Sequence, residues 1–366
     1  MIIEQYVLNE LHHLHNNSSL RKISPTQRVG GSIVYQQSKP YVSFCCNDYF
    51  GLSNNSIVKQ SAIAAIQKYG LGAGASRLIT GNHELYSILE EKLAHHSNQE
   101  SATVFTSGYT ANVGTISALM NRYDLIVADK LVHASLIDGS MLSRAQFIRF
   151  RHNDCNHCEE ILKKYRHKYR NCLLIIDHVY SMHGDIAPVS DILSLSKKYK
   201  CWTAIDDAHG FGIVPLSGKP DISLGTLSKA CGSLGGYASS LRNVIIYLHN
   251  KARSLIYTTA LPISVVTGAI IALDIIKQSF GKPLIGAKIF CKALNMPEPQ
   301  SNIVAINMPN NQVALSVQKR IAQEGFLVAA IRPPTVPYPL LRFAFTVNHK
   351  ESDIRRLCEV IRSISY

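Results

Sequence analysis

The chain has 366 residues, of which 46% are hydrophobic and 17% charged, and its formal net charge is +13. This composition excludes a disordered, collagen-like or coiled-coil chain and predicts two or three domains. No apolar stretch reaches the roughly 18 residues of a membrane span, and no signal peptide is expected because the first residues lack a basic segment. The nine cysteines follow no disulfide framework, which indicates reduced thiols and a cytoplasmic protein.

Residues 1–40 are predicted to form an N-terminal helical arm followed by a polar loop. Between residues 41 and 262, helical patterns alternate with short apolar runs, which predicts a large α/β domain with a mainly parallel sheet flanked by helices. Residues 263–366 are predicted to form a linking helix and a smaller α+β domain. We expect helices over 57–69 and 84–95, and strands over 102–106, 125–128, 173–176, 203–205, 222–227, 303–307 and 341–345.

The excess of basic residues would attract anionic partners in general. However, lysines and arginines are scattered along the sequence, and no basic helix with interleaved aromatic residues is evident. We therefore expect no nucleic-acid partner and no membrane partner. A basic rim would also suit an acidic acyl carrier.

One segment combines His152, Cys155, His157 and Cys158, which are residue types that bind metals. A structural zinc site normally needs two such ligand pairs at a set separation, and no second CxxC pair follows. We expect no metal here, and a polar surface loop is the simpler interpretation.

Two apolar runs end in residues that suit covalent cofactor chemistry. One run ends at Asp206, with His209 three residues later, and the next ends at Lys229 beside several glycines. The carboxyl ends of parallel strands are where α/β sheets bind ligands. Pyridoxal 5'-phosphate (PLP) requires a Schiff-base lysine and an acid against its pyridine nitrogen. The segment 106–110 lies between a predicted strand and a predicted helix, where backbone N–H groups favour a phosphate.

The order of these motifs along the chain resembles the α-oxoamine synthases, a family of fold-type I PLP enzymes that condense an amino acid with an acyl thioester and release CO2. The resemblance runs from about Arg21 to His349. Its landmarks are NDYFGL at 47–52, GAGASRLITGNHELYSILEEKLA at 72–94, FTSGYTANVGT at 105–115, HAS at 133–135, YSMHGD at 180–185, DDAHG at 206–210, TLSKACGSLGGY at 226–237 and IRPPTVP at 331–337.

The resemblance implies a role for each matching residue. Lys229 would hold PLP covalently and then remove the Cα proton, Asp206 would hold the pyridine nitrogen, and His209 would bond the ring's phenolic oxygen. His133 would stack on the ring, and Ser181 would lie close to it. The phosphate would be held by Ser107, Gly108 and Tyr109, assisted by Thr226 and Ser228. Two departures from the family pattern are Asp177, where glutamate is common, and Ser228, where glycine is common.

The resemblance also implies substrates and a partner. Asn47 and Arg332 would receive the amino acid's carboxylate, and Arg21 would approach the far end of the acyl chain. The family's sites lie between two subunits, so a homodimer is expected, with Thr258 and Thr259 reaching the partner's phosphate. The IRPPTVP segment is most similar to the biotin-synthesis branch, which uses L-alanine and a pimeloyl thioester, either of CoA or of a carrier protein. The alternative is a sister synthase that uses glycine or serine with another acyl-CoA, such as 2-amino-3-ketobutyrate CoA ligase.

Overall fold

The computed structural model describes residues 2–364, and the chain divides into two compact units. The large unit comprises residues 48–181 and 185–282. The small unit comprises the described residues up to Asn47, residues 182–184 and the described residues from Pro283 onward. The sequence placed the domain boundaries at residues 40 and 262, so the division falls later in the chain at both places.

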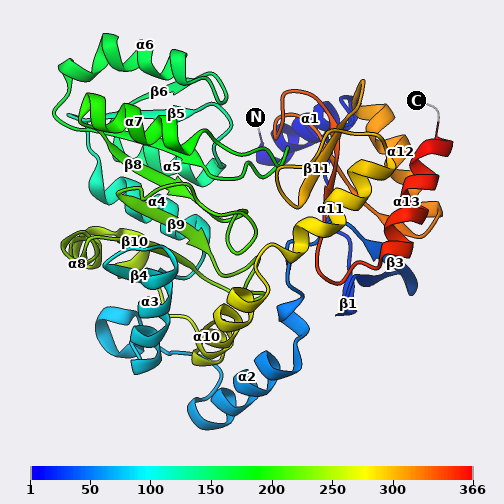
Figure 1. The fold of residues 1–366 in the computed structure, drawn as a ribbon, viewed down its shortest axis with the longest axis horizontal. Helices are drawn as coiled ribbons and strands as arrows, with labels where there is room; N and C mark the ends of the chain where they lie inside the picture. Colours follow the sequence, from blue (N-terminus) through cyan, green and yellow to red (C-terminus); the bar gives the residue numbers. More distant parts are fainter. Residues whose placement is uncertain (1, 365–366) are drawn as a thin grey trace. The chain divides into compact units, whose positions relative to one another are not determined.

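A seven-stranded sheet forms the centre of the large unit (Figure 1). Its strand order is β4-β10-β9-β8-β7-β5-β6, and only β10 runs antiparallel to its neighbours. This arrangement confirms the predicted α/β domain with a mainly parallel sheet. The strands are β4 (Ser101–Phe105), β5 (Leu125–Asp129), β6 (Gln146–Phe150), β7 (Cys172–Asp177), β8 (Trp202–Asp206), β9 (Ile222–Thr226) and β10 (Gly236–Ser240).

Helices cover both faces of this sheet because its strands are apolar on both faces. Along β5, for example, Leu125 and Val127 pack on one face with α6 and α7, whereas Ile126 and Ala128 pack on the other face with α4, α5 and α8. The helices of the large unit are α2 (Ser56–Tyr69), α3 (Glu84–His96), α4 (Gly108–Leu119), α5 (Ala134–Ser143), α6 (Cys155–Tyr165), α7 (Val189–Tyr199), α8 (Arg242–Lys251), α9 (Arg253–Ile256) and α10 (Ile263–Gln278).

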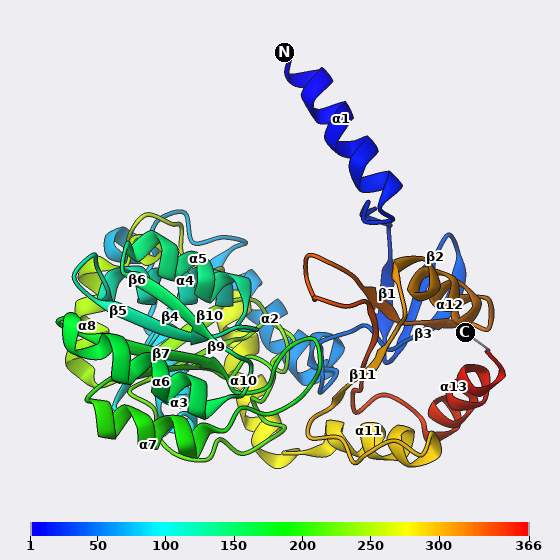
Figure 2. The ribbon, with the colours of Figure 1, turned by 90° about the horizontal axis from the view of Figure 1, so that it is seen from above.

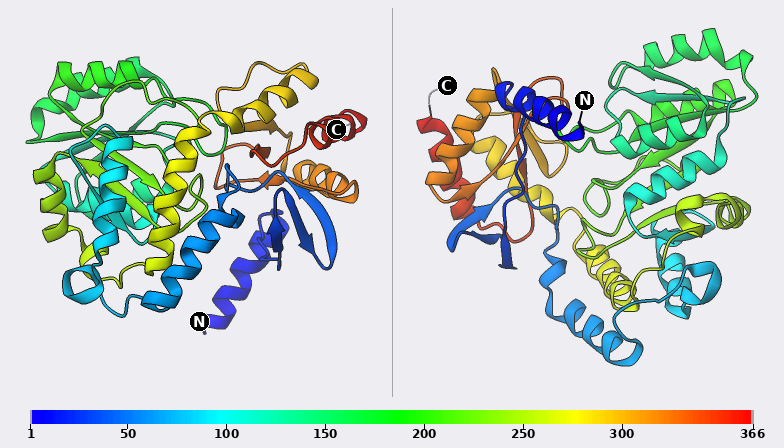
Figure 3. Two further views of the ribbon diagram at one scale, coloured as in Figure 1. Left: turned by 60° about the horizontal axis from the view of Figure 1, so that its bottom comes forward. Right: turned by 180° about the vertical axis from the view of Figure 1, so that it is seen from behind.

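Helix α10 belongs to the large unit, although the sequence assigned it to the C-terminal domain. It packs along α2 and contacts α3, and α2 and α10 lie side by side in both views of Figure 3. Its buried residues include Val266, Ala269 and Ala272. The predicted long helix after Pro262 is therefore confirmed, but its packing places it with the large unit.

The small unit is built from both ends of the described chain. Strands β1 (Gln27–Gly30), β2 (Ile33–Gln36) and β3 (Lys39–Ser43) form a sheet with β12 (Phe326–Leu327), which runs parallel to β3. A second sheet has the order β11-β14-β13, with β11 (Ile303–Asn307), β13 (Ala329–Ile331) and β14 (Leu340–Ala344). The helices are α1 (Ile3–Asn16), α11 (Lys282–Ala293), α12 (Asn311–Gln323) and α13 (Glu351–Ser363), of which the last three share one core with Phe44 and Phe343.

The predicted N-terminal helical arm is α1, and the predicted polar loop follows it over residues 17–26, but the strands after that loop were not predicted. Helix α1 has no buried residue, and Figure 2 shows it standing apart from the strands of its own unit. Residues 27–43 are not helical, because they form the antiparallel strands β1, β2 and β3. The turn between β2 and β3 places Gln37 and Ser38 at φ values of 50° and 63°, although positive φ values favour glycine and neither residue is one.

The basic residues are not uniformly scattered. The ends of α6 and α7 bring two basic runs together, because Arg166 donates hydrogen bonds to the carbonyls of Tyr199 and Lys200. The exposed lysines of this cluster, with tyrosines between them, are Lys163, Lys164, Lys168, Lys197, Lys198 and Lys200. The cluster lies at the amino ends of β7 and β8, the edge of the sheet opposite Asp177 and Asp206. The scattered basic residues of the sequence did not indicate that these short runs meet at one edge of the sheet.

Within residues 2–364, no single helix is both long and apolar enough to cross a membrane. Helices α10 and α11 reach that length and apolarity only when taken together across a break.

Candidate active site

A cavity of about 230 Å³ lies in the large unit at the carboxyl ends of β7, β8 and β9. Parallel strands place their carboxyl ends at one edge of the sheet, so residues far apart in sequence converge there. The cavity is lined by Ser107, Gly108, Tyr109, Asn112, His133, Asp177, Val179, Asp206, Ala208, His209, Thr226, Ser228 and Lys229.

Lys229 reaches into this cavity and contacts a buried histidine. Its Nζ lies 2.7 Å from Nε2 of His209, and Nδ1 of His209 lies 2.6 Å from Oη of Tyr49. When the Lys229 ammonium donates to Nε2, the second ring nitrogen of His209 carries the proton and donates to the tyrosine oxygen. Tyr49 therefore fixes the orientation of the His209 ring, whose other nitrogen accepts the hydrogen bond from Lys229.

Two carboxyl groups face the cavity from neighbouring strands, because Asp177 of β7 pairs in register with Asp206 of β8. Burial, with Asp206 beside it, raises the pKa of Asp177 well above its ordinary value. Asp206 instead accepts hydrogen bonds on both oxygens, from Ala208 N at 2.9 Å and from Asn112 Nδ2 at 2.6 Å. Each oxygen of Asp206 therefore has a donor, and these two contacts fix the direction in which its carboxyl group faces the cavity.

Hydrogen-bond donors for an anion gather at the N-terminus of α4. Ser107 is the N-cap and forms a capping box with Thr110, which leaves the first helical N–H groups, on Gly108 and Tyr109, directed outward from the helix end. The hydroxyl of Thr226 lies 2.8 Å from that of Ser228 beside them. A Cβ on Gly108 would lie only 3.0 Å from Cβ of Thr226, so glycine allows this close approach. The helix dipole adds a positive potential that suits a phosphate.

His133 precedes α5 and lines the same cavity. Its Nδ1 lies 2.7 Å from Oγ of Ser135, and its backbone N donates to Asp177 at 3.2 Å. The ring remains accessible from the cavity, yet the surrounding protein removes enough water to lower the pKa of His133, and Lys229 adds to this effect against the opposing charge of Asp206. The imidazole is therefore neutral at physiological pH and is available to stack on a flat ring.

These residues fit the cofactor that the sequence predicts. PLP has a phosphate, a basic ring nitrogen and a carbonyl carbon, and the cavity offers donors at a helix N-terminus, an ionised carboxylate and a lysine amine. The close approach of Gly108 to Thr226, which a Cβ on Gly108 would prevent, brings the backbone donors of α4 beside the Thr226 hydroxyl, and this observation favours a phosphate there. The carboxyl ends of β8 and β9 and the start of α4 supply these groups, so the fit does not depend on one loop.

Most of the predicted cofactor residues meet in the cavity. Lys229, Asp206, His209, His133, Ser107, Gly108, Tyr109, Thr226 and Ser228 all line it. The Tyr109 hydroxyl bonds to Asp138, so its backbone and not its hydroxyl is what this residue offers an anion. Ser181, Thr258 and Thr259 are not among the lining residues. Thr258 and Thr259 instead line a smaller groove with Arg77 and Tyr86.

The three predicted substrate residues all belong to the small unit. Arg21 donates to Oγ1 of Thr335 at 2.8 Å, and Arg332 donates to the carbonyl of Ser18. Asn47 accepts a hydrogen bond from the buried guanidinium of Arg342 at 3.3 Å, a contact that the sequence did not indicate. Their roles toward a substrate remain predictions.

Sequence reasoning missed Asn112 and Tyr49 as site residues. Asn112 lies four residues after Gly108 on α4, so helical spacing could have placed both on the same face. Tyr49 belongs to a landmark motif, but no periodic signal connects it with His209, which is 160 residues away in the chain.

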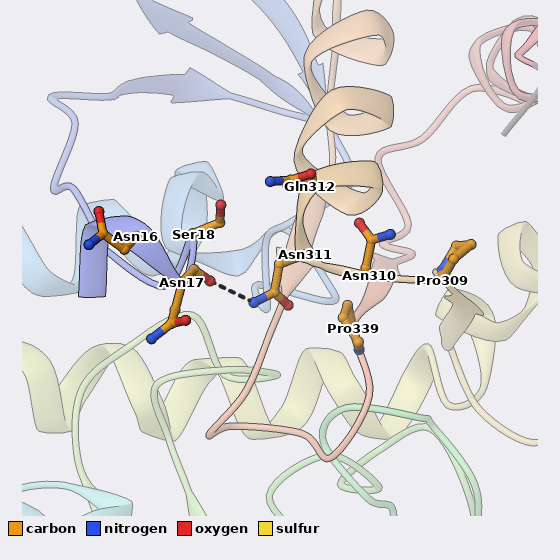
Figure 4. Close-up of a pocket in the computed structure, with 8 residues that line it drawn as sticks. All are labelled: Asn16, Asn17, Ser18, Pro309, Asn310, Asn311, Gln312 and Pro339. Atoms are coloured by element: carbon orange, nitrogen blue, oxygen red, sulfur yellow. Dashed lines mark hydrogen bonds between the residues drawn. The ribbon is translucent and has the colours of Figure 1, made fainter. Parts of the chain in front are cut away.

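A second cavity lies in the small unit, between the end of α1 and the start of α12 (Figure 4). It measures about 420 Å³ and is lined by asparagine, glutamine, serine and proline residues only. The single hydrogen bond drawn in Figure 4 runs from Asn311 to the carbonyl of Asn17. With no acid, base or nucleophile stronger than a serine hydroxyl, this cavity offers binding surface and no chemistry.

The ring nitrogens of His152 are both occupied by hydrogen bonds to carboxyl groups, so neither is directed at a metal ion. Its two ring nitrogens bond Asp129 at 3.0 Å and Asp185 at 2.7 Å, and its ring packs edge-on against Tyr180. Burial lowers the pKa of His152, but the two carboxylates outweigh this effect and raise it to about 9. Among residues 2–364, no group of three or more His, Cys, Asp or Glu side chains is arranged to hold a metal ion.

Comparison with known proteins gives a consistent assignment. The model of the aminotransferase class I and II family matches residues 39–361. The chain is 45% identical over 345 residues to the 8-amino-7-oxononanoate synthase of Methylocella silvestris, a match that covers 90% of this chain and 99% of that protein.

Solved structures show the same fold. Sphingomonas wittichii serine palmitoyltransferase matches with a TM-score of 0.89 and 25% identity, covering 98% of this chain and 96% of that chain. The 8-amino-7-oxononanoate synthase of Francisella tularensis matches with a TM-score of 0.74 and 25% identity, covering 88% and 96%. These matches confirm the PLP-dependent transferase fold of type I that the sequence predicted. The chain therefore belongs to the aminotransferase class I and II family, and within it to the PLP-dependent α-oxoamine synthases, which are acyltransferases.

Proposed function

We propose that this enzyme condenses L-alanine with a pimeloyl thioester to give 8-amino-7-oxononanoate, CO2 and the free thiol of CoA or of a carrier protein. The observation that carries this proposal is the cavity in which Lys229, His209 and Asp206 meet the N-terminus of α4. The relatives at 40–45% identity that bear the name of this synthase support the choice of substrates.

The side chains around the cavity divide the work of this reaction. When bound, PLP supplies an electron sink for the negative charge that develops at the amino acid's Cα. Asp206 favours the protonated ring nitrogen because its own charge is held by Asn112 and Ala208. Lys229 would remove the Cα proton. His209 contacts the Lys229 amine and holds it at the cavity wall. His133 would stack on the ring and hold it in place, whereas the residues that bind the amino acid would orient the bond to be broken.

The finer assignments are part of the same proposal. The enzyme works in the cytoplasm, consistent with nine cysteines in the free thiol form. As the family resemblance implies, it acts as a homodimer in which Thr258 and Thr259 serve the partner's phosphate site; in this chain the two threonines line a separate groove. Arg332 and Asn47 receive the alanine carboxylate, a task that suits a guanidinium.

A sister synthase specific for serine is the second candidate. The structural likeness to serine palmitoyltransferase covers almost the whole chain at a higher TM-score than the likeness to the synthase from Francisella tularensis. The two candidates differ in the amino acid and in the length of the acyl chain.

The deciding experiment compares amino acids on the PLP-loaded enzyme. Visible absorbance is recorded with L-alanine, glycine or L-serine, and each mixture then receives pimeloyl-CoA or palmitoyl-CoA, with products identified by mass spectrometry. We expect the spectrum to change most with alanine and the new product to require pimeloyl-CoA. Turnover only with serine and palmitoyl-CoA would select the sister activity. A folded protein without any cofactor band would contradict both.

A further inference from the structure

One buried amide connects the two groups that would hold the cofactor's ring. Asn112 is 2% exposed, and its Nδ2 donates to Oδ2 of Asp206 at 2.6 Å and to Oγ of Ser135 at 2.9 Å. Oγ of Ser135 in turn lies 2.7 Å from Nδ1 of His133. Asp206 comes from the end of β8, whereas Ser135 and His133 come from the start of α5. A single nitrogen on α4 therefore links a strand and a second helix.

The orientation of this amide is fixed by its surroundings. An amide nitrogen carries two hydrogens, and here each one has an acceptor. Rotating the amide by half a turn would place Oδ1 against the ionised Asp206, which would remove a charge-assisted hydrogen bond and create a repulsion. Oδ1 of Asn112 is itself buried and makes no hydrogen bond among the described residues, so the two donor contacts determine the orientation.

We propose that Asn112 is a positioning residue of the cofactor site: it keeps the Asp206 carboxyl group aimed into the cavity, where it would meet the ring nitrogen, and, through Ser135, it fixes the orientation of the His133 ring at the cavity wall. The inference rests on PLP as the cofactor, which is part of the proposed function. Asn112 acts through Asp206 and His133. Its amide strengthens the hydrogen bonds that hold both side chains, because connected hydrogen bonds polarise one another in a site of low dielectric constant.

Substitutions of Asn112 and Ser135 separate this role from simple space filling. Aspartate has nearly the same shape as asparagine, but in its ionised form it cannot donate and it brings a second negative charge against Asp206. Asn112→Ala removes the donor and leaves a small void, whereas Ser135→Ala removes the hydroxyl between Asn112 and His133 and keeps the contact of Asn112 with Asp206. The matched control is Thr115→Val on the same buried helix, because the Thr115 hydroxyl makes no hydrogen bond among the described residues and does not line the cavity.

The measurement is the dissociation constant of PLP, obtained by absorbance titration of the cofactor-free protein at pH 8. Residues that orient the groups of a site typically change affinity by about tenfold to a hundredfold. We expect Asn112→Asp to weaken PLP binding toward the upper end of that range, Asn112→Ala toward the lower end, and Ser135→Ala by less than Asn112→Ala. Thr115→Val should bind PLP as the unmodified chain does. Thermal unfolding of each cofactor-free variant shows whether it is folded.

The loss of the donor in Asn112→Ala decides the outcome, because Asn112→Asp also introduces a charge beside Asp206. A folded Asn112→Ala variant that binds PLP as tightly as Thr115→Val overturns the proposal. A Ser135→Ala effect that stays the same in the Asn112→Ala background would also overturn it, because linked contacts are not additive. If the unmodified chain binds no PLP, the proposed function fails first; if it binds PLP and Asn112→Ala binds equally well, only this inference fails.

Discussion

Nζ of Lys229 lies 2.7 Å from Nε2 of His209. This contact joins the amine at the end of β9 to a histidine held by β8, and it leaves the amine half-buried at the cavity wall. The position is suited to an amine that must form a covalent bond to a cofactor and later transfer a proton, since both events require a lysine that is oriented yet reachable.

Lys229→Ala removes both functions of the amine. We expect turnover to fall by about a thousandfold or more, within the range assigned to acid–base and covalent groups, and the visible band of the cofactor–lysine link to disappear. The measurements are steady-state kinetics and the absorbance spectrum. A variant that keeps full turnover would contradict the proposed mechanism.

Tyr49→Phe tests whether the hydrogen bond to Nδ1 of His209 orients this ring toward Lys229. The substitution removes the 2.6 Å contact to Nδ1, so the ring loses its orientation toward Lys229. We expect kcat to fall by about tenfold, with a loss of about 1 kcal/mol in the free energy of unfolding. Tyr237→Phe is the control, because Tyr237 is equally buried and bonds to Ser97 outside the cavity. It should lose similar stability and keep kcat; equal loss of kcat in both variants would refute the role of Tyr49.

The two cavity carboxyl groups should respond differently to amide substitution. Asp177 has a raised pKa because it is buried beside Asp206, so it is held in its neutral form, and Asp177→Asn should change kcat by less than about threefold. Asp206→Asn should lower kcat by about a hundredfold or more, because the ring nitrogen loses its counter-charge. Kinetics of the two variants side by side provide the test, and the reverse order would reassign the charge to Asp177.

The raised pKa of Asp177 also has a consequence for stability. The folded state retains a proton on Asp177 at pH values where the unfolded chain has lost it, so stability falls as the pH rises above the ordinary value of 3.8. Asp177→Asn removes this cost. Its unfolding temperature should exceed that of the unmodified chain at pH 8 and approach it at pH 4, and no pH dependence of the difference would contradict this assignment.

His152 should stabilise the large unit in a pH-dependent way. Its pKa is raised to about 9 by Asp129 and Asp185 despite partial burial, so its contribution is complete below the unfolded value near 6.5 and is lost as the pH rises through about 9. We expect His152→Ala to lower the free energy of unfolding by about 2 kcal/mol at pH 6 and by clearly less at pH 9.5. Urea unfolding at the two pH values tests this, with the exposed His167→Ala as control.

The parts of the site that follow motifs could be predicted from the sequence, and the parts that depend on packing could not. Asp206 and Lys229 end apolar strands, so their position at one sheet edge follows from strand polarity. Asn112 lies in the motif at 105–115 and, by helical spacing, on the same face of α4 as Gly108, but its contact with Asp206 follows only from the packing of α4 against β8. Tyr49 meets His209 through tertiary packing alone.

The same reasoning explains the error at the N-terminus. Strands β2 and β3 are short and partly polar, and the turn between them uses Gln37 and Ser38 at positive φ. Hairpin turns of this kind usually show Asn-Gly or Asp-Gly. Without that signal, and with the partner strand β12 at the other end of the chain, residues 27–43 resembled a loop.

The pairing of β3 with β12 also sets the order in which the two units can be completed during translation. Val42 leaves the ribosome long before its partner Phe326, and elongation at about 5–20 residues per second separates the two by tens of seconds. The segment that closes the large unit at Lys282 is synthesised within that interval. The large unit can therefore fold while β1, β2 and β3 still lack their partner, and an unpaired strand edge exposed for that long is a natural binding target for chaperones.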